Sequence, residues 1–279
     1  MIIFKKAADL SAYEKGQQHR GFSVGFVPTM GALHKGHLSL LQQSINENNS
    51  TVCSIFINPT QFNNKDDFNK YPVTIERDIE LLEAAGCTAL FLPSKEEVYP
   101  SDHVKKSYAI GHLETILEGK YRPGHFQGVC EVVDRLLSIV TPHRLYLGQK
   151  DFQQCMVIEQ LIKQSHANTK LIISPTVREE NGLAMSSRNM RLNADQKERA
   201  TAIYKSLILI KKNINSTNRK QLIDEAELVL RSAGFDVDYI EIANRNTLMP
   251  WTDGERVPKI ALIAATIDSI RLIDNMEID

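Results

Sequence analysis

Two histidines three positions apart, His34 and His37, point more directly to chemistry than any other pair in this 279-residue chain. They follow an apolar run that predicts a strand, Ser23–Val27, and they open a predicted helix from Gly36 to about Asn46. Two imidazoles, backbone N–H groups and the positive end of a helix dipole would meet there, and phosphate is the anion that they suit. The H-x-G-H spacing matches neither the GxxxxGK[ST] loop nor the GxGxxG fingerprint. A lone histidine more often caps or packs a helix end, and a zinc site needs a third ligand that is not evident nearby.

A second group of polar residues is the run Met185-Ser186-Ser187-Arg188-Asn189. Two hydroxyls, exposed amides and a guanidinium on a mobile loop suit the binding of a polyphosphate. Taken alone, such a run before a helix is more often a polar cap. Its pairing with H-x-G-H makes it more specific, because nucleotidyl-transferring Rossmann enzymes carry a basic or serine-rich loop after the last parallel strand.

A third group, Gly148-Gln149-Lys150-Asp151, follows the predicted strand Arg144–Leu147 and begins a helix. Lys150 can neutralise a phosphate. Asp151 suits a helix N-cap as well as it suits contact with a nucleotide. Gln154 is expected one turn into the helix, close enough to the binding edge of the sheet to present its amide.

Two more amides, those of Asn58 and Gln61, follow the predicted strand Thr51–Ile57 and flank a fixed turn at Pro59. Uncharged amides recognise hydroxyl and carboxylate groups directionally. They do so without repelling a triphosphate, so this segment is a candidate for binding an organic acid.

The elements that must position these groups alternate between apolar runs and amphipathic segments through residue 175. This order is typical of parallel strands joined by crossover helices, and it predicts an α/β fold with a Rossmann-like, doubly wound parallel sheet. Open sheets of this kind bind ligands at the carboxyl ends of their strands, where the groups above lie. The other predicted elements are a helix capped by Thr74 and ended by Gly86, a strand Ala89–Leu92, helices Phe126–Val140 and Asp151–Gln164, and a strand Lys170–Ser174.

The pattern changes after Pro175, where residues 176–192 are polar and loop-like. We therefore predict two domains, residues 1–175 and a smaller α+β domain of residues 176–279. The predicted elements of the second domain are helices Ala194–Asn213 and Lys220–Ala233 and strands Val237–Ile242, Ile260–Ile267 and Ser269–Ile273.

Composition excludes several classes of protein. Hydrophobic residues at 42% and charged residues at 24% are typical of a folded globular chain. A formal net charge of −1 provides no general field for nucleic acid or anionic membrane. The apolar run Ile260–Ile267 falls well short of the roughly 18 residues of a transmembrane helix. The four cysteines are widely spaced, and the N-terminus lacks the apolar core of a signal peptide, so we expect a cytoplasmic protein.

Six motifs together resemble the pantothenate synthetase family, also called pantoate-beta-alanine ligases, of the H-x-G-H nucleotidylyltransferase superfamily. H-x-G-H alone indicates only the superfamily, whereas all six in this order, across essentially the whole chain, are specific to the family. The motifs are Pro28-Thr-Met-Gly-Ala-Leu-His-Lys-Gly-His37, Phe56-Ile-Asn-Pro-Thr-Gln-Phe62, Leu117-Glu-Gly-Lys-Tyr-Arg-Pro-Gly-His-Phe126, Gly148-Gln-Lys-Asp-Phe-Gln-Gln154, Met185-Ser-Ser-Arg-Asn189 and Arg271-Leu-Ile-Asp-Asn275. One departure is Val73, where the family commonly has arginine, and it affects only a peripheral contact.

The resemblance implies a ligase that condenses (R)-pantoate with beta-alanine, uses ATP and Mg²⁺, releases AMP and pyrophosphate, and acts as a cytoplasmic homodimer. Residues 1–175 would bind ATP and pantoate, and residues 176–279 would form a lid. Catalysis would involve His34, His37, Lys150 and Arg188, with His37 as the family's proton donor. Gln61 would contact pantoate and beta-alanine, Gln154 would contact pantoate, and Asn58 would support substrate binding. The implied ATP-binding residues are Met30, Gly31, Ala32, Leu33, His34, Lys35, Gly36, His37, Gly148, Gln149, Lys150, Asp151, Val177, Met185, Ser186, Ser187 and Arg188.

Three other functions stay open at this point. A nucleotidylyltransferase would use the same H-x-G-H chemistry but would leave the nucleotide on a phosphorylated acceptor. A tRNA-charging or other RNA-binding protein is disfavoured by the near-neutral charge and by the lack of an evident anticodon-binding segment. A non-catalytic nucleotide-binding regulator would bind ATP without forming AMP.

The sequence identifies no Mg²⁺ ligands.

Overall fold

The computed structural model describes residues 1–278, and their contacts divide the chain into two compact units. Unit 1 consists of Met1–Gln149 and Gln153–Pro175, and unit 2 of Lys150–Phe152 and the chain from Thr176 onward. The short segment Lys150–Phe152 thus groups with the later part of the chain, although a linear division at residue 175 would place it in the first domain. The assignment of a lid role to the second domain stays a prediction.

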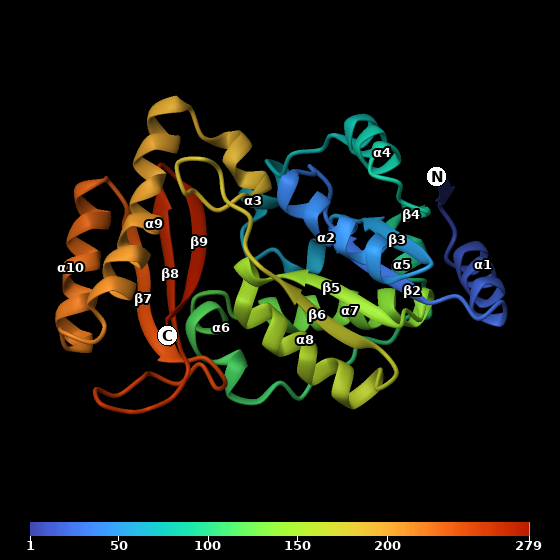
Figure 1. Ribbon diagram of the computed structural model, residues 1–279. Coiled ribbons are helices and arrows are strands. Elements are labelled where there is room, and N and C mark those ends of the chain that lie inside the picture. Colours follow the sequence, from blue (N-terminus) through green and yellow to red (C-terminus); the bar gives the residue numbers. More distant parts are fainter. Residues whose placement is uncertain (279) are drawn as a thin grey trace. The chain divides into compact units, whose positions relative to one another are not determined.

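Unit 1 is built on a six-stranded sheet in the order β1-β4-β3-β2-β5-β6, and every neighbouring pair is parallel (Figure 1). The strands are β1 (Ile2–Phe4), β2 (Val24–Thr29), β3 (Ser50–Ile55), β4 (Ala89–Phe91), β5 (Arg144–Gly148) and β6 (Lys170–Ser174). All six residues of β3 are buried, as expected of a central parallel strand covered on both faces. The predicted α/β, doubly wound fold is confirmed.

Helices α2 (Lys35–Glu47) and α4 (Ile75–Ala84) cover one face of this sheet (Figure 1). The buried cluster on this face joins both helices to the strands through Val27, Leu33, Leu40, Leu41, Cys53, Ile55, Leu82, Cys87, Leu90 and Tyr146. The strand order reverses between β4 and β5, so right-handed crossovers place α7 (His125–Val140) and α8 (Phe152–Ser165) on the other face. The reversal puts β2 beside β5.

Several short or weakly patterned elements of unit 1 were not predicted. Helix α1 (Ala7–His19) buries only Leu10 and Glu14, so it offers no apolar stripe from which periodicity could identify it. Edge strand β1 has only three residues. The remaining unpredicted elements are α3 (Lys65–Asn69), α5 (Lys95–Val98), α6 (Leu117–Tyr121) and the 3₁₀ helices η1 (Pro59–Gln61) and η2 (Gly111–Glu114). The 3₁₀ helix η3 (Gln149–Asp151), also unpredicted, has its last two residues in unit 2.

Unit 2 contains an antiparallel sheet, β7-β8-β9, against which α9 (Ala194–Asn213) and α10 (Arg219–Ser232) pack (Figure 1). Its strands are β7 (Asp236–Asn244), β8 (Lys259–Ile267) and β9 (Ile270–Ile278), and η4 (Ser187–Arg191) precedes α9. The predicted α+β class is confirmed. Strand β9 continues five residues beyond the predicted end at Ile273, because the polar residues Asp274 and Asn275, which suggest a strand end, are buried. Among residues 1–278, no helix is long and apolar enough to cross a bilayer.

Candidate active site

The predicted site residues Met30–His37 occupy the turn after β2 and the first residues of α2. Gly31 has a φ of +81°, a conformation that glycine adopts without strain. His34 is the N-cap of α2, and its Nδ1 accepts the N–H of Gly36 at 3.1 Å. His37 closes the reciprocal half of this capping box, because its Nδ1 accepts the N–H of His34 at 3.4 Å.

These hydrogen bonds fix the chemistry that the two imidazoles can offer. A ring nitrogen that accepts an N–H cannot carry a proton, so the neutral rings of His34 and His37 are protonated at Nε2. The ring centroids lie 4.0 Å apart, and both side chains are half-buried. The turn therefore holds two imidazoles, each with its proton on Nε2, at the positive end of a helix dipole, which is an arrangement suited to an anion.

The residue that shapes this turn, Asp78, was missed by the sequence analysis. Its fully buried carboxylate accepts the N–H of Ala32 at 2.9 Å and that of Leu33 at 2.8 Å. The Thr74 hydroxyl donates to the same carboxylate at 3.1 Å, so the predicted N-cap of α4 bonds a side chain instead of a backbone N–H. Asp78 thus ties the segment before the histidines to α4, and its position four residues after a threonine gave no signal of that role.

The amides predicted to bind the organic acid lie in η1, directly after β3. The Nδ2 of Asn58 donates to the Oε1 of Gln61 at 3.2 Å, and the Nε2 of Gln61 lies 3.0 Å from the sulfur of Met30. The structure therefore brings Gln61 beside the first residue of the predicted ATP-binding segment. Asn58 is buried and also bonds Thr60 and Tyr99, so its amide acts as a support for Gln61.

Helix α7 packs against η1 and holds it in place. The Nδ1 of His125 lies 2.8 Å from the carbonyl oxygen of Gln61. Gly128 permits the close approach of the two helices, since a Cβ at this position would lie 2.4 Å from the carbonyl oxygen of Thr60. The first turn of α7 thus positions a residue of the second motif.

Gly148 ends β5, Gln149–Asp151 form η3, and α8 begins at Phe152. Because β2 and β5 are neighbours, Gly148 and Gln149 follow the same edge of the sheet as the histidine turn, at the point where the strand order reverses. Ligands bind at this point in open α/β sheets. Gln154 is half-buried in the first turn of α8, while its neighbour Gln153 is buried and bonds η2 and α6.

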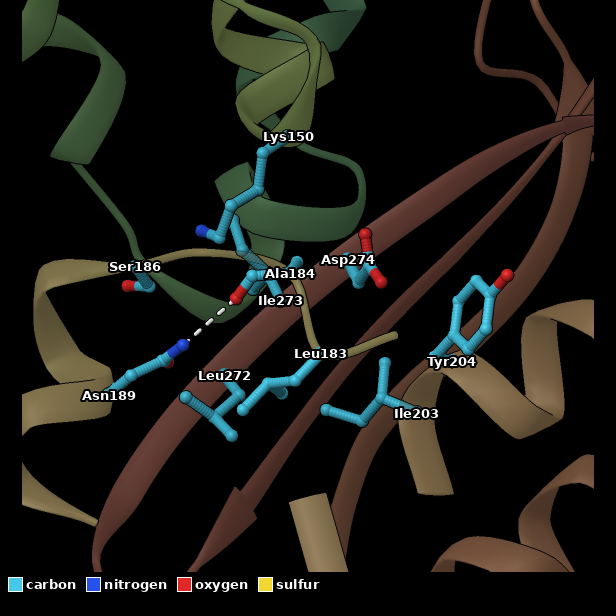
Figure 2. A pocket seen from close by; sticks show the side chains of 10 residues that line it. All are labelled: Lys150, Leu183, Ala184, Ser186, Asn189, Ile203, Tyr204, Leu272, Ile273 and Asp274. Atoms are coloured by element: carbon cyan, nitrogen blue, oxygen red, sulfur yellow. Dashed lines mark hydrogen bonds between the residues drawn. The ribbon is translucent and has the colours of Figure 1, made fainter. Parts of the chain in front are cut away.

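The predicted site residues of unit 2 include Lys150 and Ser186, which line one small pocket (Figure 2). The Oγ of Ser186 accepts the N–H of Arg188 at 3.2 Å and caps η4. Asn189, which also lines the pocket, donates to the carbonyl oxygen of Ala184 at 3.0 Å (Figure 2). Val177 takes part through its backbone, where its carbonyl oxygen accepts the N–H of Met185 at 3.0 Å.

An ion pair at this pocket was also not foreseen. Arg178 donates to both carboxylate oxygens of Asp274, at 2.5 and 3.1 Å. Burial raises the pKa of the Asp274 carboxyl, and the Arg178 guanidinium opposes that rise. Asp274 belongs to one of the six motifs, but the pairing with Arg178 cannot be read from it.

The fold and the donors at its switch point define the class of protein. It is an α/β enzyme of the H-x-G-H type, in which two imidazoles at a helix N-terminus follow a central strand of a doubly wound sheet.

Comparison with known proteins identifies the family within that class. A model of the family described as Pantoate-beta-alanine ligase matches residues 2–277. The chain is 45% identical to a pantothenate synthetase of Cytophaga hutchinsonii over 284 aligned residues, which cover 100% of this chain and 99% of that relative. A crystal structure of pantothenate synthetase from Thermus thermophilus superimposes with a TM-score of 0.92 at 37% identity and covers 99% of both chains.

A second solved structure, pantoate-beta-alanine ligase from Francisella tularensis complexed with beta-gamma ATP and beta-alanine, has a TM-score of 0.84 and 37% identity. It covers 99% of this chain and 97% of its own. The chain belongs to the pantoate-beta-alanine ligase family. It is a ligase that forms an amide bond, and the resemblance drawn from its six motifs is confirmed.

Proposed function

We propose that this ligase activates (R)-pantoate with ATP as a pantoyl adenylate and then transfers the pantoyl group to beta-alanine. The observation that carries the proposal is the capping box of His34 and His37, which fixes two imidazoles at the N-terminus of α2 through their Nδ1 atoms. The Francisella tularensis relative, complexed with an ATP compound and beta-alanine, supports the choice of ligands.

Activation is needed because a carboxylate does not acylate an amine at neutral pH, since oxide is a poor leaving group. In the first step a carboxylate oxygen of pantoate forms a bond to the α-phosphorus of ATP, and the bond to the pyrophosphate oxygen breaks. Negative charge grows on the phosphate oxygens during this step. Donors that are already in place before the reaction stabilise that charge most effectively.

The residues proposed to stabilise this charge come from three segments. His34 and His37 would donate from Nε2, and Lys150 would contribute its ammonium group. The phosphates would also be bound by Ser186, Ser187 and Arg188, which are the N-cap and the first two residues of η4. Losing one such donor costs on the order of 3 kcal/mol in the transition state, or roughly a hundredfold in rate.

The acid and the amine would be recognised by amides. We assign Gln61 to the hydroxyl or carboxylate groups of pantoate, held by Asn58 and by the sulfur contact with Met30. Gln154 would supply a second amide to pantoate. In the second step the amine of beta-alanine forms a bond to the pantoyl carbonyl carbon, AMP leaves, and the amine loses a proton. Water must be kept from the adenylate between the steps, which is the role proposed for a lid formed by the second domain.

Mg²⁺ enters the proposal only as an ion bound to the phosphates of ATP. Among residues 1–278, no group of three or more His, Cys, Asp or Glu side chains could hold a metal ion. Mg²⁺ commonly binds substrate phosphates with few protein ligands. We therefore assign the ion to the phosphates of the nucleotide and route no step through it.

An AMP-release assay with single omissions tests the function. AMP should form only when ATP, pantoate and beta-alanine are all present, and pyrophosphate should form in one turnover without beta-alanine. A nucleotidylyltransferase would instead leave the nucleotide on a phosphorylated acceptor, and a regulator would bind ATP without forming AMP. AMP formation in the absence of either pantoate or beta-alanine would refute the proposal.

We also propose a cytoplasmic homodimer. All four cysteines are buried free thiols, which suits a reducing compartment. The dimer rests on the family resemblance, and light scattering that reports only monomer at micromolar concentration would contradict it.

A further inference from the structure

One motif, Arg271-Leu-Ile-Asp-Asn275, has no task in the proposed mechanism. It lies in β9, and its last two residues are only 4% and 3% exposed although both are polar. Burying polar groups is costly unless they are hydrogen-bonded. Their partners therefore show what the motif does.

The partner of Asp274 is Arg178, which begins a tight hairpin. Arg178 also donates to the carbonyl oxygen of Gly182 at 3.2 Å, and its guanidinium stacks over the Tyr204 ring at 4.7 Å. Gly182 packs against the same ring so closely that a Cβ would lie 2.2 Å from it. Asp274 and Tyr204 both line the pocket that Lys150 and Ser186 line (Figure 2).

This hairpin leads directly into the predicted phosphate-binding run. Its strands pair through Arg178 and Ala184, and the N–H of Met185 donates to the carbonyl oxygen of Val177. Ser186 follows without any intervening residue. Asp274, through Arg178, therefore fixes the base from which Ser186, Ser187 and Arg188 extend.

Asn275 holds the other phosphate-binding residue. Its Nδ2 donates to the carbonyl oxygen of Lys150 at 2.9 Å, and its own N–H donates to the Asp274 carboxylate at 2.8 Å. Two consecutive residues of one strand thus hold two segments that are distant in the sequence, one with Lys150 and one with the serine-arginine run.

We propose that Asp274 and Asn275 are positioning residues that set the separation between Lys150 and the Ser186–Arg188 run for binding the phosphates of ATP. This inference rests on the proposed function, because it takes those residues as phosphate ligands. Neither Asp274 nor Asn275 is proposed to contact substrate. They act through Arg178 and through the backbone of Lys150.

The primary test is Asn275→Ala, which removes the bond to Lys150 without leaving a buried charge unpaired. We expect the dissociation constant of ATP, measured by titration calorimetry without pantoate, to rise about tenfold. The KM for ATP should rise with it, while the KM for beta-alanine should stay within twofold. Loss of overall folding would instead lower the active fraction, and so kcat, without changing either constant.

Asp274→Asn is the second variant and should weaken ATP binding similarly. This variant leaves Arg178 without a charged partner, so the melting temperature of the variant is measured together with its ATP affinity. The matched control is Asp238→Asn, which removes an ion pair from the same sheet, that of Asp238 with Arg271 at 2.6 Å, without touching the hairpin or Lys150. This control should bind ATP within twofold of the wild type.

An Asn275→Ala protein that binds ATP as the wild type does, or a control that loses as much affinity, overturns the positioning role. The calorimetric readout separates this failure from a failure of the proposed function. Wild-type protein that binds ATP but releases no pyrophosphate with pantoate would refute the proposed reaction, and a tenfold weaker ATP affinity of Asn275→Ala would still support positioning.

Discussion

His34 and His37 each have a structural task in addition to the proposed chemical one. Their Nδ1 atoms complete the capping box at the start of α2, so the proposed chemistry is assigned to their Nε2 atoms. Alanine variants would remove both contributions at once, since an N-cap is worth about 1 kcal/mol. Variants that keep the cap are therefore needed to measure the chemistry.

We predict that His37→Gln retains the fold but lowers pyrophosphate release from ATP and pantoate by about a hundredfold or more. Glutamine at the third helical position can still accept the N–H of residue 34, whereas it cannot transfer a proton as an imidazole does. Rapid-quench measurement of a single turnover provides the rate, and thermal melting verifies the fold. Near-normal pyrophosphate release would show that His37 takes no part in the chemistry.

At the scale of elements, η1 and α7 form one support for the predicted pantoate ligand. Gly128 lets α7 approach the η1 backbone so closely that a methyl group would overlap the carbonyl of Thr60. Asn58 then bonds the side chain of Gln61, and the Nδ1 of His125 lies 2.8 Å from its carbonyl oxygen. The position of the Gln61 amide thus depends on a residue that has no side chain.

We predict that Gly128→Ala raises the KM for pantoate at least tenfold and destabilises the protein by about 1–3 kcal/mol, because η1 must shift to admit the methyl group. Gly16→Ala in α1 is the matched control, since a Cβ there meets nothing within 4 Å. It should stabilise the protein by up to about 1 kcal/mol and leave the KM for pantoate unchanged. Steady-state kinetics and urea denaturation measure both effects, and equal KM values for the two variants would contradict the prediction.

Helix α1 carries an unusual buried acid, Glu14. Neither of its carboxylate oxygens has a hydrogen-bond partner among the described residues, and burial raises its pKa from 4.5 to about 7. The folded protein therefore holds this proton more tightly than the unfolded chain does. The contribution of Glu14 to the free energy of unfolding therefore falls as the pH rises from about 4.5 through 7, and its full penalty, on the order of 3 kcal/mol, applies above pH 7.

We predict that Glu14→Gln is more stable than the wild type at pH 8 and loses this advantage near pH 4.5, because the neutral amide has no charge to bury. Urea denaturation at the two pH values measures the difference in the free energy of unfolding. Glu80→Gln, at an exposed position of α4, should show no such dependence. A Glu14→Gln protein with the same pH slope as the wild type would contradict the burial of an ionisable carboxylate.

At the scale of the whole molecule, the proposed ATP ligands come from segments that are far apart in the sequence. We predict that a non-hydrolysable ATP analogue slows hydrogen exchange at the backbone amides of residues 32–37 and also of residues 185–188. Binding to the native state protects the amides of the segments that it orders. Exchange mass spectrometry on the full chain provides the measurement. Protection confined to one of these segments would show that the other does not bind the nucleotide.

Much of the fold follows from local pattern. Apolar runs and helical spacing predicted β5, β6 and α9 within about one residue, because β5 and β6 each contain a short apolar run and the buried residues of α9 recur at helical spacing between Ala200 and Ile210. Helix α1 was missed because it buries so little, and the end of β9 was missed because two of its buried residues, Asp274 and Asn275, are polar and hydrogen-bonded. Sequence patterns report apolar burial, and they do not report polar burial.

By itself, the sequence determined the doubly wound class, the placement of the histidine pair between a strand and a helix, and the family. Only the tertiary structure decided that Asp78 shapes the histidine turn, 45 and 46 residues away, and that Asp274 and Asn275 hold Arg178 and Lys150, 96 and 125 residues away. The physical reason is that periodicity and capping are interactions within a few residues along the chain. A hydrogen bond between distant segments depends instead on which strands and helices the folded chain places side by side.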